Sequence, residues 1–149
     1  MPMIDVYAPA DLFPAEADAA LGDELSHAVL RAEGVAEPTA YHLDNTAVFV
    51  HRLPTTAIST AAEQPSRNVR IQIVTPPGSL DRDGQRQITK EATEIVGRLT
   101  GDSALTVRTW VILTEAAEGG WGIAGTAFGV EEFSALARAA AAARSPQDS

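Results

Sequence analysis

Cysteine is absent from this 149-residue sequence, which excludes disulfide bonds, thiolate metal ligands and thiol nucleophiles together. Basic residues are scarce, since 11 lysines and arginines stand against 20 aspartates and glutamates, for a formal net charge of -9. Nucleic-acid affinity comes mainly from cationic side chains that release counterions, so this balance disfavours binding to nucleic acid. A localised basic site for a small anion stays compatible with it.

Long apolar runs are also missing, and no stretch approaches the roughly 20 residues of a membrane-spanning helix. The first residues lack the basic region and apolar core of a signal peptide. We therefore expect a soluble cytoplasmic protein without a membrane partner. His42 and His51 have no third ligand at metal-binding spacing, so no metal site is expected. The length predicts one domain covering residues 1–149.

The chain contains two strand-helix-strand patterns in succession. In the first, residues 2–54, the alternation of Met3–Ala8 predicts a half-buried strand, helical spacing from Pro14 to Glu33 predicts an amphipathic helix, and 46–53 predicts a second strand. A linker at about 55–68 follows. The second pattern has an alternating strand from Val69, a helix with its apolar stripe between Ile88 and Leu99, and a strand at 107–114.

Such a repeated unit predicts duplication, and an α+β fold in which a four-stranded mixed sheet carries both helices on one face. The Gly-rich segment 115–129 favours a hairpin, Val130 to Arg144 a terminal helix, and 145–149 a frayed tail. The second face of the sheet also carries apolar residues. We expect either another subunit or the Ala-rich terminal helix to cover it.

Pro2 is the residue with the most distinctive chemistry. An internal proline has a tertiary amide nitrogen without basicity, but removal of Met1 would leave a secondary amine fixed at the start of the first strand. Methionine is commonly removed before so small a residue. Many chains also begin Met-Pro without catalytic consequence, so the dipeptide gains meaning only from the rest of the chain.

Several features together resemble the tautomerase superfamily, which includes 4-oxalocrotonate tautomerase and macrophage migration inhibitory factor. They are Pro2 opening a strand, the two strand-helix-strand units, Val107-Arg108 followed by Thr114-Glu115, and the segment from Trp121 to Gly125. The last is similar to the aromatic-Gly-Ile-Gly-Gly hairpin of short family members. The resemblance extends to about Phe128 and leaves out the terminal helix. It implies a fused, double-length subunit that forms a homotrimer.

The resemblance also implies that Pro2 is a catalytic base that needs no metal or cofactor, and that an arginine contacts the substrate. Arg108 is the best candidate for that arginine, whereas alignment from the hairpin puts Trp110 there; in a strand both would face the same side. Trp121 matches the aromatic that walls the family's pocket. Arg108 could instead be a solvated strand arginine, and Trp121 an ordinary core or interface tryptophan.

The departures from the family limit the substrate. Short members carry a clamping arginine just after the first strand, where this chain has Asp11-Leu12 and, in its second half, Ser79-Leu80. The cis-3-chloroacrylic acid dehalogenases carry two arginines after the third strand and a water-activating tyrosine and glutamate, and this chain has no clear match for the glutamate. Hydrolytic dehalogenation is not expected, and a carboxylate on the substrate is less secure than for the type members.

Other polar residues have open roles. Tyr7 and Asp5 point away from Ile4 and would line the pocket or face another layer, while His51 and Arg52 would reach a neighbouring subunit's Pro2 or stay exposed. His27, Arg67, Arg70, Glu115 and Glu118 are further candidates whose default is a solvated surface.

The sequence thus predicts a cofactor-independent tautomerase or isomerase of a small keto or enol compound, with Pro2 as base and Arg108 as the carbonyl or anion contact. The alternatives are a lyase or decarboxylase of the same superfamily that uses Pro2 as a general acid, and a non-enzymatic oligomer with this fold.

Overall fold

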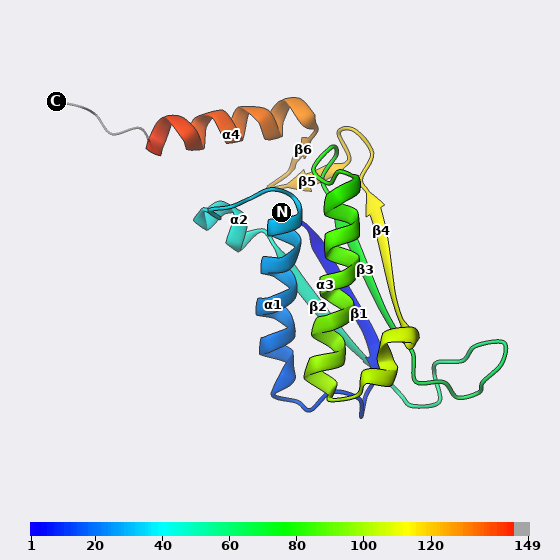
Figure 1. Cartoon of the computed structure of the whole chain (residues 1–149). Coiled ribbons are helices and arrows are strands. Elements are labelled where there is room, and N and C mark those ends of the chain that lie inside the picture. Colours follow the sequence, from blue (N-terminus) through cyan, green and yellow to red (C-terminus); the bar gives the residue numbers. More distant parts are fainter. Residues whose placement is uncertain (145–149) are drawn as a thin grey trace.

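The computed structural model describes residues 1–144, and the frayed tail expected at 145–149 lies outside the described residues. It has the expected α+β architecture (Figure 1). In chain order the elements are β1 (Met3–Pro9), α1 (Ala17–Ala32), α2 (Ala40–Asp44), β2 (Ala47–Leu53), β3 (Val69–Thr75), α3 (Arg82–Thr100), the 3-10 helix η1 (Ser103–Arg108), β4 (Thr109–Glu115), β5 (Trp121–Ile123), β6 (Thr126–Phe128) and α4 (Val130–Arg144). No helix within residues 1–144 is long and apolar enough to cross a membrane.

The four long strands form one mixed sheet in the order β2-β1-β3-β4. β1 runs parallel to β2 and antiparallel to β3, and β3 runs parallel to β4. Met3 pairs with Ala47 on one side and with Val74 on the other. The first strand of the chain is therefore an inner strand, hydrogen bonded along both edges, and the chain begins in the middle of the sheet.

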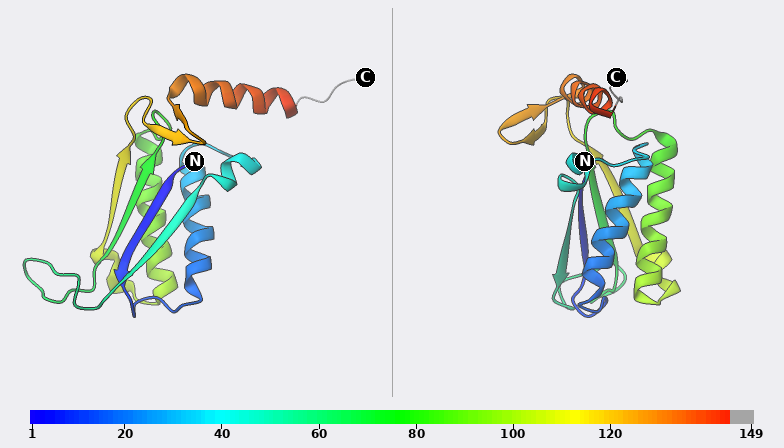
Figure 2. Two further views of the ribbon diagram at one scale, coloured as in Figure 1. Left: turned by 180° about the vertical axis from the view of Figure 1, so that it is seen from behind. Right: turned by 90° about the vertical axis from the view of Figure 1, so that its left-hand side faces the viewer.

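Helices α1 and α3 pack on one face of this sheet and against each other (Figures 1 and 2). The side chains between them are the alternate, inward-facing positions of β1 and β3 and the apolar stripes of both helices. The largest fully buried ones are Ile4, Val6, Leu21, Leu25, Val29, Leu30, Val69, Ile71, Ile73, Ile88, Val96 and Leu105. The expected arrangement of both helices on one face is confirmed.

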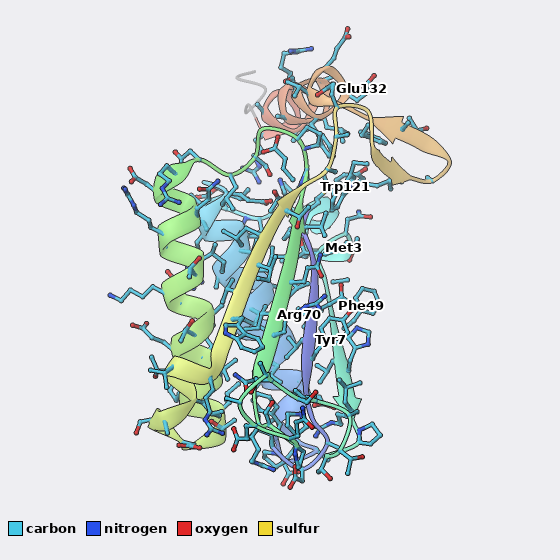
Figure 3. The ribbon with its side chains drawn as sticks, turned by 90° about the vertical axis from the view of Figure 1, so that its right-hand side faces the viewer. Met3, Tyr7, Phe49, Arg70, Trp121 and Glu132 are labelled. Carbon is cyan, nitrogen blue, oxygen red and sulfur yellow. The ribbon has the colours of Figure 1, made fainter. Side chains whose placement is uncertain are left out.

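The second face of the sheet keeps large apolar side chains exposed. Phe49 on β2 is 52% exposed, and Trp110 and Ile112 on β4 are 45% and 46% exposed. Figure 3 shows Met3, Tyr7 and Phe49 pointing away from the helices. Helix α4 does not lie on this face, as one alternative expected, but crosses the end of the sheet at which β1 begins (Figure 2). Covering by another subunit is the alternative that remains.

Two segments differ from the sequence prediction. The connection before β2 contains the short helix α2, whose Thr39 and His42 form a capping box. The strand expected at 107–114 begins only at Thr109, because residues 103–108 form η1. Asp102 caps this helix by accepting a hydrogen bond from the Ala104 N–H at 2.9 Å, and Leu105 anchors it in the core.

Gly84 sets the spacing between the start of α3 and the end of α1. A Cβ at this position would lie 2.4 Å from the Ala32 carbonyl oxygen and 2.8 Å from Leu80 Cδ1. The first contact is with backbone, which cannot move without displacing the end of α1. Only glycine permits this approach. The contact lies at the end of α1, where Ala32 is followed by Glu33, a residue of the candidate site described below.

Gly84→Ala is expected to lower the free energy of unfolding by about 1 to 3 kcal/mol, because the overpacking outweighs the gain of roughly 1 kcal/mol in helix propensity. Gly97→Ala in the same helix is the matched control, since a Cβ there meets only the Asp102 carbonyl oxygen at 4.0 Å. It should raise stability. Urea denaturation of both variants measures the two effects, and equal stabilisation by both would contradict the close contact at Gly84.

Candidate active site

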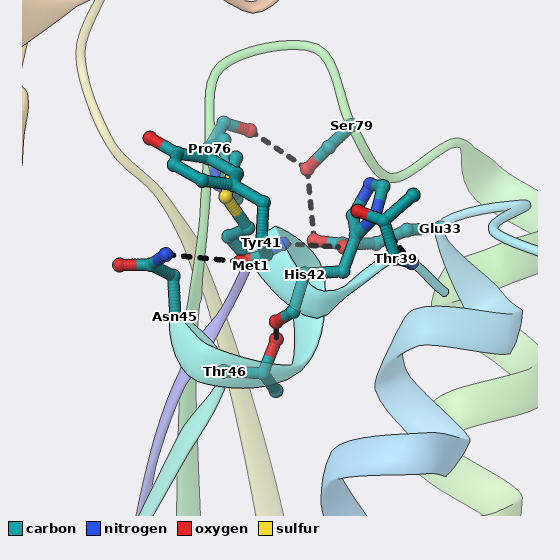
Figure 4. A network of polar contacts seen from close by, with 9 residues as sticks. All are labelled: Met1, Glu33, Thr39, Tyr41, His42, Asn45, Thr46, Pro76 and Ser79. Atoms are coloured by element: carbon teal, nitrogen blue, oxygen red, sulfur yellow. Dashed lines mark hydrogen bonds and ion pairs between the residues drawn. The ribbon is translucent and has the colours of Figure 1, made fainter. Parts of the chain in front are cut away.

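The chain begins in a cavity of about 510 Å³ at the end of the sheet. One wall is the segment that leaves α1 and continues through α2, a second is the loop after β3, and α4 closes the third side (Figure 4 shows the polar part). The lining residues are Met1, Glu33, Val35, Thr39, Tyr41, His42, Pro76, Pro77, Gly78, Ser79, Val130, Phe133, Ser134, Leu136, Ala137, Ala139 and Ala140. Segments from three other regions of the sequence thus meet around the N-terminus.

The N-terminal amine forms an ion pair with Glu33 in this cavity. The nitrogen of Met1 lies 3.2 Å from Glu33 Oε2, and the two side chains are 7% and 3% exposed. Burial lowers the pKa of the Met1 amine, an effect that the carboxylate opposes. Burial likewise raises the pKa of Glu33 against the opposing effect of the amine. Because burial disfavours both charged forms, it favours a pair in which the amine and the carboxyl group share one proton over a pair of full opposite charges.

A hydroxyl network supports both protonation states of Glu33. Ser79 Oγ lies 3.1 Å from Glu33 Oε1 and 2.8 Å from the Pro76 carbonyl oxygen (Figure 4). The hydroxyl donates to the carboxylate when Glu33 is ionised. When Glu33 is protonated, its O–H can donate to Ser79 Oγ while Ser79 donates to Pro76. The carboxyl group therefore keeps a hydrogen-bond partner in either state.

His42 lines the same cavity in a defined tautomer. The Thr39 N–H donates to His42 Nδ1 at 3.2 Å, so Nδ1 is an acceptor and a neutral ring carries its proton on Nε2. Burial lowers the pKa of His42 below its ordinary value of 6.5, and the positive charges of the N-terminus and Arg144 lower it further. His42 is thus a neutral hydrogen-bond donor near the amine.

Of the residues that the sequence singles out as site candidates, Pro2 alone adjoins this cavity, through its peptide bond to Met1, although it is not among the lining residues. It is buried directly before β1, and its carbonyl oxygen accepts a hydrogen bond from the Ala47 N–H at 3.3 Å. Tyr7, Asp5 and His51 come together instead on the free face of the sheet. The rings of Tyr7 and His51 stack at 4.3 Å, and His51 Nε2 lies 2.6 Å from Asp5 Oδ1. Arg70 lies over the Tyr7 ring at 4.9 Å.

Arg108 is not brought near Pro2 within one chain. The expectation that it shares a strand face with Trp110 is wrong, because Arg108 ends η1, where its guanidinium lies 3.4 Å from Glu63. Thr109, which follows Arg108, pairs with Val69 at the first residue of β3, whereas the chain start lies beside the last residues of β3, since Met3 pairs with Val74. About six strand residues, or about 20 Å, therefore separate Arg108 from Pro2, a distance that no arginine side chain spans.

The remaining expected residues have structural partners. Arg52 points to the helix side and donates to the carbonyl oxygens of Ala10, Phe13 and Pro14, so it ties β2 to the loop before α1. Trp121 is 6% exposed on β5 and does not line the cavity, whereas Trp110 lies on the free face.

The surface candidates also have partners within their own region. Arg67 pairs with Asp11 at 3.1 Å, and His27 Nδ1 lies 2.8 Å from the Asp23 carbonyl oxygen on exposed α1. Glu118 accepts from the Val130 N–H at 2.9 Å and so caps α4. These contacts account for the side chains without a catalytic role.

The sequence did not single out Glu33 and His42 as site residues, although Glu33 pairs with the amine and His42 lines the same cavity. Glu33 appears in the sequence only as the last residue before the helix-ending Gly34, and His42 as part of a polar connection. The one local signal was the spacing Thr39-x-x-His42, which matches a capping box with histidine in the place of Glu or Gln. Their convergence on the N-terminus depends on tertiary structure.

His42→Gln is expected to reduce the acid sensitivity of the fold, since glutamine preserves the capping box. Because the folded-state pKa of His42 is depressed, the unfolded chain binds more protons as pH falls through about 6.5, and the wild type loses stability there. The difference in unfolding free energy, wild type minus variant, should fall between pH 7.5 and 5.5, by an amount that solvent screening of the partly exposed ring keeps below about 1 kcal/mol. Urea titrations at several pH values measure it, and parallel curves would contradict the neutral state of His42.

The sequence matches no known family model and no curated protein. Solved structures do match. A fused 4-OT described as a symmetric trimer is 16% identical, with 83% of this chain and 93% of that chain covered and a TM-score of 0.69. A member of the cis-3-chloroacrylic acid dehalogenase family is 18% identical, with coverages of 97% and 93% and a TM-score of 0.70. A macrophage migration inhibitory factor-like protein from Entamoeba histolytica is 14% identical, with coverages of 85% and 98% and a TM-score of 0.65.

Identities this low speak for the fold, and the coverage extends over nearly the whole of each matched chain. This chain therefore shares the fold of these structures, including that of a fused 4-OT.

Proposed function

We propose that this chain is a tautomerase-superfamily enzyme that interconverts keto and enol forms of a small carbonyl compound without a cofactor, with the Pro2 secondary amine as base after removal of Met1. One observation carries the proposal: the chain begins inside a cavity, at an inner strand, with a buried amine held against Glu33. A surface N-terminus would have neither the depressed pKa nor the enclosure that proton abstraction from carbon requires.

Burial favours a base over an acid at this position. An amine in water has a pKa of roughly 8 and is mostly protonated at neutral pH. Desolvation lowers the pKa of the Met1 amine, and Pro2 is itself buried, so the same effect acts on its nitrogen once Met1 is gone. A lyase or decarboxylase that uses Pro2 as a general acid needs the opposite shift, so the burial supports the isomerase.

Glu33 completes the proton chemistry in this proposal. The Pro2 nitrogen is one peptide unit, about 3 Å, from the Met1 nitrogen that Glu33 now contacts, a gap that a side-chain shift or one water closes. When Pro2 takes a proton from the carbon next to the carbonyl, an oxygen of the Glu33 carboxyl group accepts a hydrogen bond from the ammonium that forms. The same proton then returns to a different atom of the enolate, so the reaction consumes nothing and releases nothing.

We further propose that the enzyme is a homotrimer. The exposed apolar residues on the free face of the sheet are too large a surface for a monomer to leave in water. Fused 4-OT structures that share this fold are described as trimers, both symmetric and asymmetric. In such an assembly Arg108 would reach an active-site cavity only from a neighbouring subunit.

Pro2→Ala is expected to lower kcat for ketonisation of phenylenolpyruvate about 100-fold, because a less basic and less rigid primary amine replaces the ring nitrogen. Intact-mass spectrometry of both proteins establishes first whether Met1 has been removed. Loss of the enol absorbance then gives the rates. An active wild type that retains Met1, or equal rates for the two proteins, would rule out the amine as base.

Ile112→Glu is expected to dissociate the oligomer, because it places a charge on the free face of the sheet where a subunit would have to desolvate it. Thr89→Glu adds the same charge to the exposed side of α3 and should leave the assembly intact. Analytical ultracentrifugation gives both masses. A wild type of monomer mass would refute the trimer.

A further inference from the structure

We infer that the substrate of this cavity is an uncharged carbonyl compound that bears an apolar group, and not a carboxylate. This inference rests on the proposed function and names its substrate class. It follows from the charges that line the cavity, from the state of His42, and from the wall that α4 supplies.

The first step is the charge of the cavity. Among its lining residues, all within the described part of the chain, none is an arginine or lysine. Its charged groups are the N-terminal amine and Glu33, which lie 3.2 Å apart and neutralise each other. Of the two arginines of α4, Arg138 is not among the lining residues, and Arg144 is turned to Glu37, where its Nη2 donates to the backbone carbonyl oxygen at 3.0 Å.

The pair of the amine and Glu33 gives a bound anion no net attraction. Because the amine and Glu33 together carry no net charge while they share one proton, the amine has no surplus positive charge for a substrate carboxylate. Proton abstraction requires the neutral amine, which has none at all. A carboxylate that enters this cavity loses its water and gains no cationic partner, and Glu33 repels it whenever it is ionised.

The third step is the group that receives the carbonyl oxygen. The neutral imidazole of His42, with its proton on Nε2, offers a hydrogen bond without a charge. Such a donor can polarise a ketone or aldehyde and stabilise the enolate oxygen while the site stays electrically neutral. The neutral imidazole suits an uncharged substrate, whereas an arginine in its place would suit an anionic one.

The rest of the cavity suits an apolar group on the substrate. The side of α4 that faces the cavity is apolar, with Val130, Phe133, Leu136 and Ala140 among the lining residues, and Tyr41 adds a ring from α2. A volume of about 510 Å³ is within the range of small-molecule sites and holds an aromatic ring beside a carbonyl group. Removal of Met1 enlarges it by a side chain.

The test compares phenylenolpyruvate with its methyl ester, which lacks the negative charge and carries one additional methyl group, and uses enol-oxaloacetate as the dicarboxylate. We expect wild-type kcat/KM, corrected for the uncatalysed rate, to be at least tenfold higher for the ester than for the acid, and lowest for the dicarboxylate. Glu33→Gln should reduce the ratio of ester to acid severalfold, because it removes the carboxylate that repels a substrate anion. Glu94→Gln on exposed α3 removes an equal charge outside the cavity and should preserve the ratio.

Pro2→Ala separates the two proposals. A wild type that turns over the acid or dicarboxylate faster than the ester, while Pro2→Ala is inactive on all three, keeps the catalytic amine and overturns the substrate class; the cation then comes from a neighbouring subunit. Equal rates for wild type and Pro2→Ala on every substrate overturn the proposed function itself. A Glu33→Gln protein that fails to fold leaves the wild-type ratio as the deciding measurement.

Discussion

The central constraint on this structure is that its first strand is hydrogen bonded along both edges. An edge strand can release its chain end to solvent, but β1 lies between β2 and β3, so the amine that starts the chain is enclosed from both sides. An enclosed charge needs a partner, and Glu33 at the end of α1 supplies it. The close contact that Gly84 permits between α3 and α1 holds that helix end in place. The site is thus a consequence of the sheet order.

The duplication explains why the two halves are chemically unequal. Both units contribute one parallel strand pair and one helix to the sheet, and β1 and β3 occupy corresponding inner positions. The second unit, however, begins at Val69, whose nitrogen is an amide in the middle of the chain. The loop after β3, which would follow the same plan as the loop after β1, instead contributes Ser79 to the cavity around the first unit's amine. One half supplies the N-terminal amine and the other helps to enclose it.

Much of the fold could be predicted because its signals are local. The alternation over Met3–Ala8 and from Val69 places β1 and β3, and α4 begins at Val130, as the sequence predicts. The start of β4 could not be placed in this way. Val107 and Arg108 continue an apolar and polar alternation, but the Asp102 cap and the buried Leu105 hold the chain in η1 for one more turn. That turn moves Arg108 off the strand.

The site was less accessible to sequence reasoning. Pro2 is visible because its chemistry depends on its place in the sequence, whereas Glu33 and His42 matter only through the segments they meet. A glutamate before a helix-ending glycine is ordinary in itself, and nothing local shows that it will be 3% exposed beside an amine. Tyr7 was predicted to point away from Ile4, toward the pocket or another layer, and it does point away, but the face on which it stacks with His51 lies away from the cavity.

The buried N-terminus also orders events in the life of the protein. An aminopeptidase must grip an extended chain end, and here the amine and side chain of Met1 are both inside the folded molecule, with the amine in an ion pair. The proposed removal of Met1 would therefore have to precede the pairing of β1 with β2 and β3, because the folded chain encloses the amine that an aminopeptidase binds.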